Sequence, residues 1–377
     1  MALSTPVLTD GVVTLRTHTP HDVDDMIAMG TDPETVRWTT VPTPYERSHA
    51  LDWVELSAGE RPRDATAHRW AIEAADGSTP RFAGNIDLRL DGAPDLGYAL
   101  APWARGRGLM QRAVRLVTAW AFDALGLPVV HWSAHAGNFA SWRVAHACGF
   151  TYQGAVPLSQ PQRGTLHDGW FATLRPDDDT SIPRTTWWPV PVLENERVRL
   201  RPFTDADVPR IVEACSDERT RRWLTLIPHP YTEESARAFI RTNELEGSLG
   251  KKVSWAVVDP ADDLLLANVG IFRLDGPFNP TGAEIGYWAH PQARGRGVVS
   301  TAVQLVLDHA FTPVEKAGLG RSRVVVGASW TNTASRRVAE ANGFTLYAHT
   351  RMEGLIGLGD DMELDDGAWY ELLAVDH

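Results

Sequence analysis

The hydrophobic pattern of the first half of the chain predicts short strands and amphipathic helices in alternation. Apolar and polar residues alternate at 13–15, and Pro20-His21-Asp22 is a typical helix start. Strands separated by Gly or Pro are then expected at 70–74, 83–90 and 96–101, and a buried strand rich in β-branched residues at 129–134. Between them, one apolar helix face is expected from Val114, Val117, Ala121, Phe122 and Leu125.

The second half of the chain repeats this order. Its helix carries an apolar face made of Val303, Val306, Leu307, Ala310 and Phe311. A buried strand is expected after it, at 324–329. Each half therefore predicts an α/β domain in which helices flank a mixed, mostly antiparallel sheet.

The repetition extends to individual residues. Trp70-Ala71-Ile72 recurs as Trp255-Ala256-Val257, 185 residues later. Between the copies, the proline-containing stretch from Pro176 to Pro191 is typical of an extended linker. The predicted organisation is two tandem domains, at 1–180 and 195–377, joined by a linker at 181–194.

Length and charge narrow the class of protein. A chain of 377 residues is longer than a domain with a single hydrophobic core usually is, which favours two domains. The content of 43% hydrophobic and 22% charged residues is typical of globular proteins. The net charge of −12 argues against nonspecific nucleic-acid binding as the main activity. No apolar run approaches the roughly 20 residues that span a bilayer, and Met1 to Asp10 lacks the features of a secretory signal. We therefore expect neither a nucleic-acid nor a membrane partner.

Cysteine usage indicates the compartment. Cys148 and Cys215 are the two cysteines of the chain, one in each half, which favours a reducing cytoplasm over a disulfide scaffold. Closely spaced Cys and His positions of zinc-site type are absent from the sequence, so no metal is expected.

A glycine- and arginine-rich turn is the strongest chemical signal. Ala104-Arg105-Gly106-Arg107-Gly108 recurs as Ala293-Arg294-Gly295-Arg296-Gly297, each time between a Gly-Tyr strand and an amphipathic helix. Glycine lets the backbone approach a phosphate closely, and the free N–H groups and dipole of a helix start favour negative charge. Two copies in matching contexts predict a duplicated phosphate-binding domain, with a plain helix cap as the alternative.

The order of motifs resembles a known family. A strand, the arginine-glycine loop, a helix, a strand, then Asn-x-x-Ser and a helix ending in Gly-Phe are similar to the GNAT superfamily of N-acetyltransferases, in particular its RimJ/RimL branch. The resemblance covers nearly the whole of both halves. It implies acetyl-CoA, or another acyl-CoA, as cosubstrate and a primary amine as acceptor. It also implies direct attack in a ternary complex, with no covalent enzyme intermediate.

The resemblance assigns the arginine-glycine loops to the pyrophosphate of the cosubstrate. The family pattern, (Gln or Arg)-x-x-Gly-x-(Gly or Ala), is complete in the second half, where Gln292 precedes Arg294, Gly295, Arg296 and Gly297. In the first half, Trp103 stands at the Gln position, ahead of Arg105, Gly106, Arg107 and Gly108. Since backbone amides supply most of the contacts, Trp103 is expected to weaken this site rather than abolish it.

The resemblance also assigns residues to the pantetheine arm and to the leaving thiolate. In the family, the strand before the loop splays from its neighbour and pairs with the arm. The matching residues are Ala99, Leu100 and Ala101, and Trp288, Ala289 and His290. Asn138 and Asn332 match an asparagine that contacts the arm, and Ser141 and Ser335 match a serine proposed to protonate the thiolate. Asn and Ser are equally preferred as helix N-caps, and this alternative stays open.

A general base has one candidate in each half. Glu284 and Asp95 open the Gly-Tyr strand at equivalent positions, where histone-type relatives carry a base. The alternative is that the acid only hydrogen-bonds a neighbouring strand. Tyr98 and Tyr287 are expected to be core residues at the centre of the sheet.

The acceptor is the least specified part of the prediction. The second half carries an acidic, glycine-rich insertion from Gly354 to Glu363, in the region that walls the acceptor site in the family. Its carboxylates favour a cationic small-molecule amine, and a solvated loop is the alternative. A second hypothesis is a peptide or protein α-amine as acceptor, and a third is that one domain only binds acyl-CoA or serves as a scaffold. The second domain is the expected main catalyst because its loop is complete and it keeps Glu284. The oligomeric state stays open.

Overall fold

The computed structural model describes residues 5–58, 66–277 and 279–377, and the chain divides into two compact units, Met1–Arg184 and Thr185–His377. The expected linker at 181–194 belongs to the second unit from Thr185 onward. The Thr185 hydroxyl donates to the carbonyl of Ser248 at 2.8 Å, and the Trp188 indole donates to the carbonyl of Gly250 at 3.1 Å. These bonds anchor the chain to the second unit before its first strand begins.

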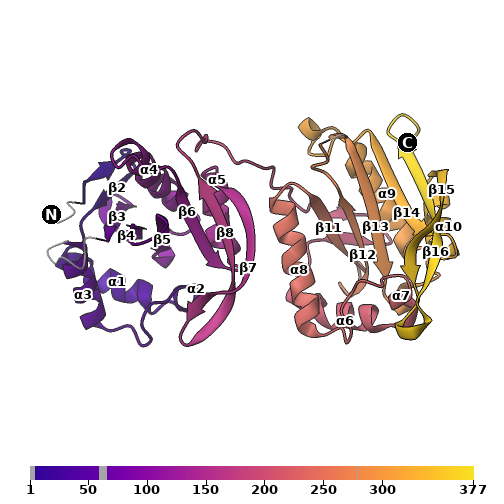
Figure 1. Ribbon diagram of the computed structural model, residues 1–377, viewed down its shortest axis with the longest axis horizontal. Coiled ribbons are helices and arrows are strands. Elements are labelled where there is room, and N and C mark those ends of the chain that lie inside the picture. The colour runs from indigo at the N-terminus through magenta and orange to yellow at the C-terminus, as the bar shows by residue number, and fades with distance from the viewer. Residues whose placement is uncertain (1–4, 59–65, 278) are drawn as a thin grey trace. The chain divides into compact units, whose positions relative to one another are not determined.

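The first unit is an eight-stranded sheet with helices on both faces (Figure 1). The strands run in the order β1-β2-β3-β4-β5-β6-β8-β7, and every pair is antiparallel except β5 with β6. The strands are β1 (Leu8–Thr9), β2 (Val13–Arg16), β3 (Ala67–Asp76), β4 (Thr79–Arg89), β5 (Asp95–Leu100), β6 (Val130–His135), β7 (Thr151–Gln162) and β8 (Thr165–Leu174). The helices are α1 (Val23–Gly30), α2 (Pro33–Trp38), α3 (Arg47–Ser57), α4 (Leu109–Asp123) and α5 (Phe139–Ala147).

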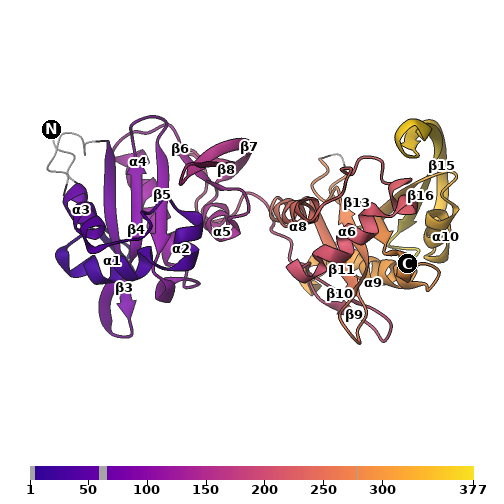
Figure 2. The ribbon, with the colours of Figure 1, turned by 90° about the horizontal axis from the view of Figure 1, so that it is seen from below.

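The second unit has the same architecture (Figure 2). Its sheet order is β15-β16-β14-β13-β12-β11-β10-β9, and β13 with β14 is the parallel pair. The strands are β9 (Leu193–Glu194), β10 (Arg199–Arg201), β11 (Lys252–Val258), β12 (Leu265–Phe272), β13 (Gly282–Ala289), β14 (Arg323–Ser329), β15 (Thr345–Ile356) and β16 (Glu363–Leu373). The helices are α6 (Val208–Ser216), α7 (Glu218–Arg221), α8 (Glu233–Ser248), α9 (Val298–Phe311) and α10 (Thr333–Ala341). The prediction of two tandem α/β domains with mixed, mostly antiparallel sheets is confirmed.

Strand alternation divides each core into two layers. In the second unit, Trp255 and Val257 of β11 pack in the cluster that contains the buried face of α9, including Val303 and Leu307. The neighbouring residues of β11 face the other way, into a cluster with α6 and α8. One face of the sheet is thus covered by the helix that follows the glycine loop, and the other by the helices that precede β11.

Equivalent tryptophans fix the start of each sheet. The indole of Trp70 donates to the carbonyl of Pro6 at 2.7 Å, and that of Trp255 donates to the carbonyl of Pro191 at 2.9 Å. Both indoles are fully buried. Among the described residues, no helix is both long and apolar enough to span a membrane.

Candidate active site

Each glycine loop forms a cradle of backbone N–H groups at a helix start. Gly108 and Gly297 are the N-cap residues of α4 and α9, with φ of +72° and +73° and no side-chain cap. The N–H groups of the first helical turn have no partner within the helix, and they point toward whatever lies in front of it. A Cβ built on Gly106 or Gly295, both at φ +72°, would meet nothing within 4 Å. This open space, in front of free amides and a helix dipole, fits a pyrophosphate group.

The first arginine of each loop is held by the protein itself. Arg105 pairs with Asp32 and donates to the Thr35 hydroxyl at 2.9 Å. Arg294 pairs with Asp217 in the same way, and donates to the Thr220 hydroxyl at 2.7 Å. These arginines therefore fasten the cradle to α2 or α7.

Two aspartates missed by the sequence analysis complete this fastening. Asp32 and Asp217 also cap α2 and α7 by accepting the amides of Thr35 and Thr220, at 3.0 and 2.9 Å. Burial opposes their ionisation, but the hydrogen bonds from arginine and from the capped amide lower the pKa of both carboxyls. The repeated Asp-x-x-Thr, 185 residues apart, was the signal for this contact.

The expected difference between the two loops does not extend to the backbone of the cradles. The Trp103 indole donates to the carbonyl of Phe82 at 3.3 Å, and the Arg107 guanidinium stacks on its ring. The Gln292 carbonyl oxygen accepts from Arg210 at 3.2 Å. The glycine torsions of the two loops match, so the two cradles have the same backbone conformation.

A gap between two parallel strands leads away from each cradle. β5 pairs with β4 over its whole length, from Asp95 to Leu100, but with β6 only at Asp95 and Leu96. β13 continues to Ala289, but its pairing with β14 ends at Glu284. The splayed strand that the family resemblance implied is therefore present twice.

Strand alternation decides which backbone groups face each gap. The amides of Ala101 and His290 donate to the carbonyls of Ala83 and Leu266, both at 2.8 Å, so they point into the sheet. Ala99 and Trp288 share that direction, because the backbone groups of alternate residues point to the same side. The backbone groups of Leu100 and Ala289 therefore face the gap, as do those of Tyr98 and Tyr287. Of the six residues expected to pair with a pantetheine arm, Leu100 and Ala289 have backbone groups directed toward it, and the Leu100 carbonyl also accepts from the Arg105 Nε at 3.3 Å.

The Asn-x-x-Ser motifs combine a helix cap with a hydroxyl pair. Asn138 and Asn332 are N-caps of α5 and α10, and each accepts the amide of the serine three residues later, at 3.1 and 3.2 Å. The two asparagines are therefore helix N-caps, as the alternative interpretation of the motif expected. The Ser335 hydroxyl lies 3.1 Å from the Tyr287 hydroxyl, and Ser141 lies 3.1 Å from that of Tyr98.

The two tyrosines expected in the core therefore also reach the candidate site. Burial raises the pKa of both phenols, that of Tyr287 to about 12, so each hydroxyl keeps its proton and remains a hydrogen-bond donor. In the first unit, the Trp132 indole also donates to Tyr98 and Ser141, at 2.8 and 3.1 Å. Such a hydroxyl pair is able to deliver a proton to a thiolate at the end of the gap.

The two candidate bases differ in their surroundings. Asp95 is held by the Arg89 guanidinium, whose Nε lies 2.9 Å from its carboxylate. The Glu284 side chain is 13% exposed, with the Arg273 Nε 3.1 Å from its carboxylate. Burial raises the pKa of Glu284, and Arg273 opposes the shift. Glu284 is therefore better suited than Asp95 to accept a proton near neutral pH.

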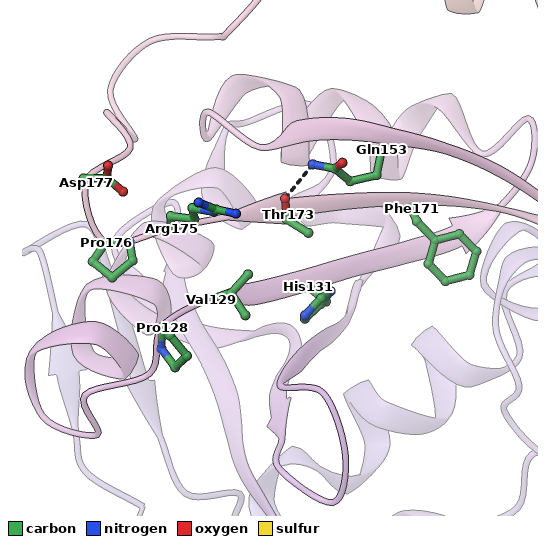
Figure 3. A pocket seen from close by; sticks show the side chains of 9 residues that line it. All are labelled: Pro128, Val129, His131, Gln153, Phe171, Thr173, Arg175, Pro176 and Asp177. Carbon is green, nitrogen blue, oxygen red and sulfur yellow. Dashed lines mark hydrogen bonds between the residues drawn. The ribbon is translucent and has the colours of Figure 1, made fainter.

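A separate hollow of about 870 Å³ lies elsewhere on the first unit. Figure 3 shows its lining side chains, which come from β6 and the two residues before it, from β7 and β8, and from the segment that follows β8. The hollow borders His131, which pairs with Asp95 where β5 and β6 are still joined, whereas the cradle lies beyond the other end of β5. It is therefore distinct from the gap and the cradle.

Comparison with known proteins follows the same two-unit division. The family model described as "Acetyltransferase (GNAT) domain" matches residues 13–151 and 197–345. The putative ribosomal N-acetyltransferase YdaF of Bacillus subtilis is 25% identical over 190 residues, which are 48% of this chain and 92% of that protein. The ribosomal-protein-serine acetyltransferase of Escherichia coli is 30% identical over 115 residues, 30% of this chain and 59% of that protein. A ribosomal-protein-S5-alanine acetyltransferase structure from Vibrio fischeri matches with a TM-score of 0.42 and 19% identity, covering 49% of this chain and 98% of that one.

Proposed function

This chain belongs to the GNAT acetyltransferase family, and from that premise we propose that it acetylates the N-terminal amine of a peptide or protein. Acetyl-CoA is the cosubstrate. The names of two relatives, a ribosomal N-acetyltransferase and a ribosomal-protein-serine acetyltransferase, support a protein acceptor over the small-molecule amine expected from the sequence. Transfer to a nitrogen is the chemistry that the family supplies.

The observation that carries the proposal is the intact pair of cradle and gap in each unit. The amides at the starts of α4 and α9 hold the pyrophosphate of the cosubstrate, and the backbone groups of Leu100 and Ala289 that face the gap align its arm. Because both units have these features with matching glycine torsions, each binds one acetyl-CoA. The complete sequence pattern of the second loop therefore gives no reason to prefer the second unit as the main catalyst.

The protein's own groups supply the proton transfers of the reaction. The amine nitrogen attacks the carbonyl carbon, so a C–N bond forms, the C–S bond breaks, the nitrogen loses a proton and the sulfur gains one. Glu284 takes the proton from nitrogen in the second unit. Ser335, hydrogen-bonded to Tyr287, gives a proton to the sulfur, and Ser141 has this role beside Tyr98.

The test compares acceptor classes with the purified full-length chain. Thiol release from acetyl-CoA is measured with free peptides, with the same peptides blocked at the N-terminus, and with small primary amines. Free peptides are expected to give a kcat/KM at least about tenfold above both other classes, because a site built for a peptide rejects groups that leave its polar atoms unpaired. Equal or faster reaction of the small amines would favour the small-molecule acceptor instead. Binding of acetyl-CoA without turnover of any acceptor would indicate a noncatalytic module.

A further inference from the structure

A cluster of polar side chains in the first unit has no counterpart in the second. Asp87, His18 and Trp53 lie on the face of the sheet that α1 and α3 cover. Asp87 and Asn85, two positions apart on β4, point to the same face, where His18 contacts both Asn85 and the Trp53 ring. The Arg69 guanidinium, from the β3 position opposite Asp87, also lies over the Trp53 ring, at 5.7 Å.

Strand register identifies the equivalent residues in the second unit. Asp87 pairs with Gly97 just before Tyr98, and Gly270 pairs with Gly286 just before Tyr287. Gly270 therefore occupies the position of Asp87.

The aromatic partners are matched in a similar way. His18 stands two residues after Arg16, which pairs with Asp22. Phe203 stands at the same distance after Arg201, which pairs with Asp207, so Phe203 is the equivalent of His18. Phe203 packs against Phe239 of α8 at 5.5 Å between ring centroids, as His18 packs against Trp53 of α3 at 6.4 Å. The second unit thus has Gly, Phe and Phe where the first has Asp, His and Trp.

Asp87 lies on β4 beside β5, whose other edge borders the gap between β5 and β6. Its Oδ1 lies 2.7 Å from the place where a Cβ of Gly97 would be, so the carboxylate covers Gly97 directly. The next residue, Tyr98, has its backbone groups turned to the gap. The side chain of Asp87 is 15% exposed, and its Oδ2 lies 3.6 Å from the Arg89 Nε. Burial raises the pKa of Asp87 to about 6, while Arg89 and Arg69 oppose the shift and Asp95 adds to it.

His18 and Trp53 each bury a polar atom that has no partner. His18 is 4% exposed, and its Nε2 lies 2.7 Å from the side-chain oxygen of Asn85. Because that oxygen accepts, Nε2 carries the hydrogen and Nδ1 is left as a buried acceptor. The Trp53 Nε1–H is a buried donor without a partner. A buried polar group without a partner is costly, so the presence of two such groups together points to a ligand that pairs with both.

We propose that Asp87, His18 and Trp53 form the acceptor site of the first unit and recognise the backbone of a peptide N-terminus. This inference rests on the proposed function. A peptide presents an amine, then a carbonyl acceptor, then an N–H donor. The amine would donate to the Asp87 carboxylate, and the carbonyl would accept from the Trp53 indole N–H. The next amide N–H would donate to the His18 Nδ1. The second unit, with Phe203, Phe239 and Gly270, lacks these groups.

The site gives the first unit its own proton acceptor. The amine nitrogen forms a bond to the acetyl carbon, the carbon–sulfur bond breaks, and the proton released from nitrogen passes to the Asp87 carboxylate. The thiolate takes its proton from the Ser141 and Tyr98 pair. Asp95, which shares the position of Glu284, stays paired with Arg89 and takes no part.

The test uses the full chain carrying Gly295→Ala, so that turnover reports the first unit. In this background, Asp87→Asn is expected to lower kcat for a peptide about 100-fold or more, which is within the usual range for loss of a general base. The affinity of the same peptide, measured by calorimetry with coenzyme A present, is expected to fall much less than kcat, because the asparagine keeps the size of the side chain and one oxygen acceptor for the amine. Asp91→Asn, an exposed aspartate on the turn after β4, is the matched control and is expected to leave both values unchanged.

Two further readouts separate chemistry from folding. Trp53→Phe is expected to weaken peptide binding about tenfold through loss of one hydrogen bond. In the Gly295→Ala background, kcat is expected to fall as pH drops through about 6, because the Asp87 carboxylate must be ionised to accept a proton. The Asp87→Asn variant is expected to lose this decrease of kcat at low pH. The charged and titratable groups that act on Asp87 are Arg69, Arg89 and Asp95.

The outcomes distinguish this inference from the function on which it rests. Peptide turnover that survives Asp87→Asn within about threefold, with an unchanged pH profile, would overturn the acceptor site and leave the function standing. If the wild-type chain acetylates no peptide, the proposed function itself fails. Unaltered peptide affinity in Trp53→Phe would likewise remove the indole from the site.

Discussion

The two cradles allow a matched perturbation of acetyl-CoA binding. Gly106 and Gly295 have the same φ of +72°, and at both positions a Cβ would meet no atom of the protein within 4 Å. An alanine at either position therefore fits the folded unit. Its penalty there is the left-handed backbone, about 1–2 kcal/mol of the free energy of unfolding. The added methyl group enters the open space in front of the cradle amides.

The expected loss of affinity follows from the hydrogen bonds that the methyl group displaces. Bonds from amides to a charged group contribute about 1.5–3 kcal/mol each. If the methyl displaces two of them, binding weakens by about 3–6 kcal/mol, or about 10²- to 10⁴-fold in Kd. The affected cradle would then be empty at micromolar acetyl-CoA, while the other cradle is untouched.

Calorimetry with coenzyme A measures this directly. The wild-type chain is expected to bind two molecules, each single alanine variant one, and the Gly106→Ala/Gly295→Ala chain none. Melting curves check that each variant is folded. A wild-type stoichiometry of one would refute the argument that the two cradles are equivalent. So would a single variant that binds two molecules with unchanged affinity, because the amides would then not hold the ligand.

Two further predictions concern the pH dependence of stability and acceptor recruitment. Burial lowers the pKa of His18 to about 4, below its unfolded value of about 6.5, so its contribution to stability is complete above pH 6.5 and declines as pH falls toward 4. Relative to His18→Phe, which copies Phe203, the wild-type first unit is expected to lose about 2 kcal/mol more between pH 7 and pH 5 in urea titrations, and equal losses would contradict this pKa. Neutralising the acidic insertion is expected to raise KM severalfold for a basic peptide at low salt, and an unchanged KM would mark the insertion as a solvated loop. The side chains to neutralise are Asp360, Asp361 and Glu363, of which Glu363 lies 3.6 Å from Arg222.

The fold was predictable because its signals are local and occur twice. Hydrophobic periodicity located α4, α9 and the central strands, and the repeated Gly-Tyr and Arg-Gly elements located the gap and the cradle. The loop glycines were a reliable signal because the backbone conformation itself requires them. All four, Gly106, Gly108, Gly295 and Gly297, adopt a positive φ. These features need no knowledge of which side chains meet across the sheet.

The side-chain contacts of the site were harder to predict because they depend on register. The pairing of Asp87 with Gly97 requires the alignment of β4 with β5, which a single sequence does not fix. Arg105 was expected to bind phosphate, and its capture by Asp32 depends on where α2 packs. Comparison of Trp103 with Gln292 predicts a weaker first loop, and this stays a prediction, since the structure shows only that both side chains contact neighbours within their own units.

The position of the transferred acetyl group shows whether this chain acetylates N-terminal amines. The full-length chain is incubated with isotopically labelled acetyl-CoA and a peptide that contains both a free N-terminus and an internal lysine, and fragment-ion mass spectrometry locates the label. The proposed function predicts the label on the N-terminal nitrogen, with none after Gly106→Ala and Gly295→Ala are combined. A label on the lysine alone, or transfer that persists in the doubly substituted chain, would contradict it.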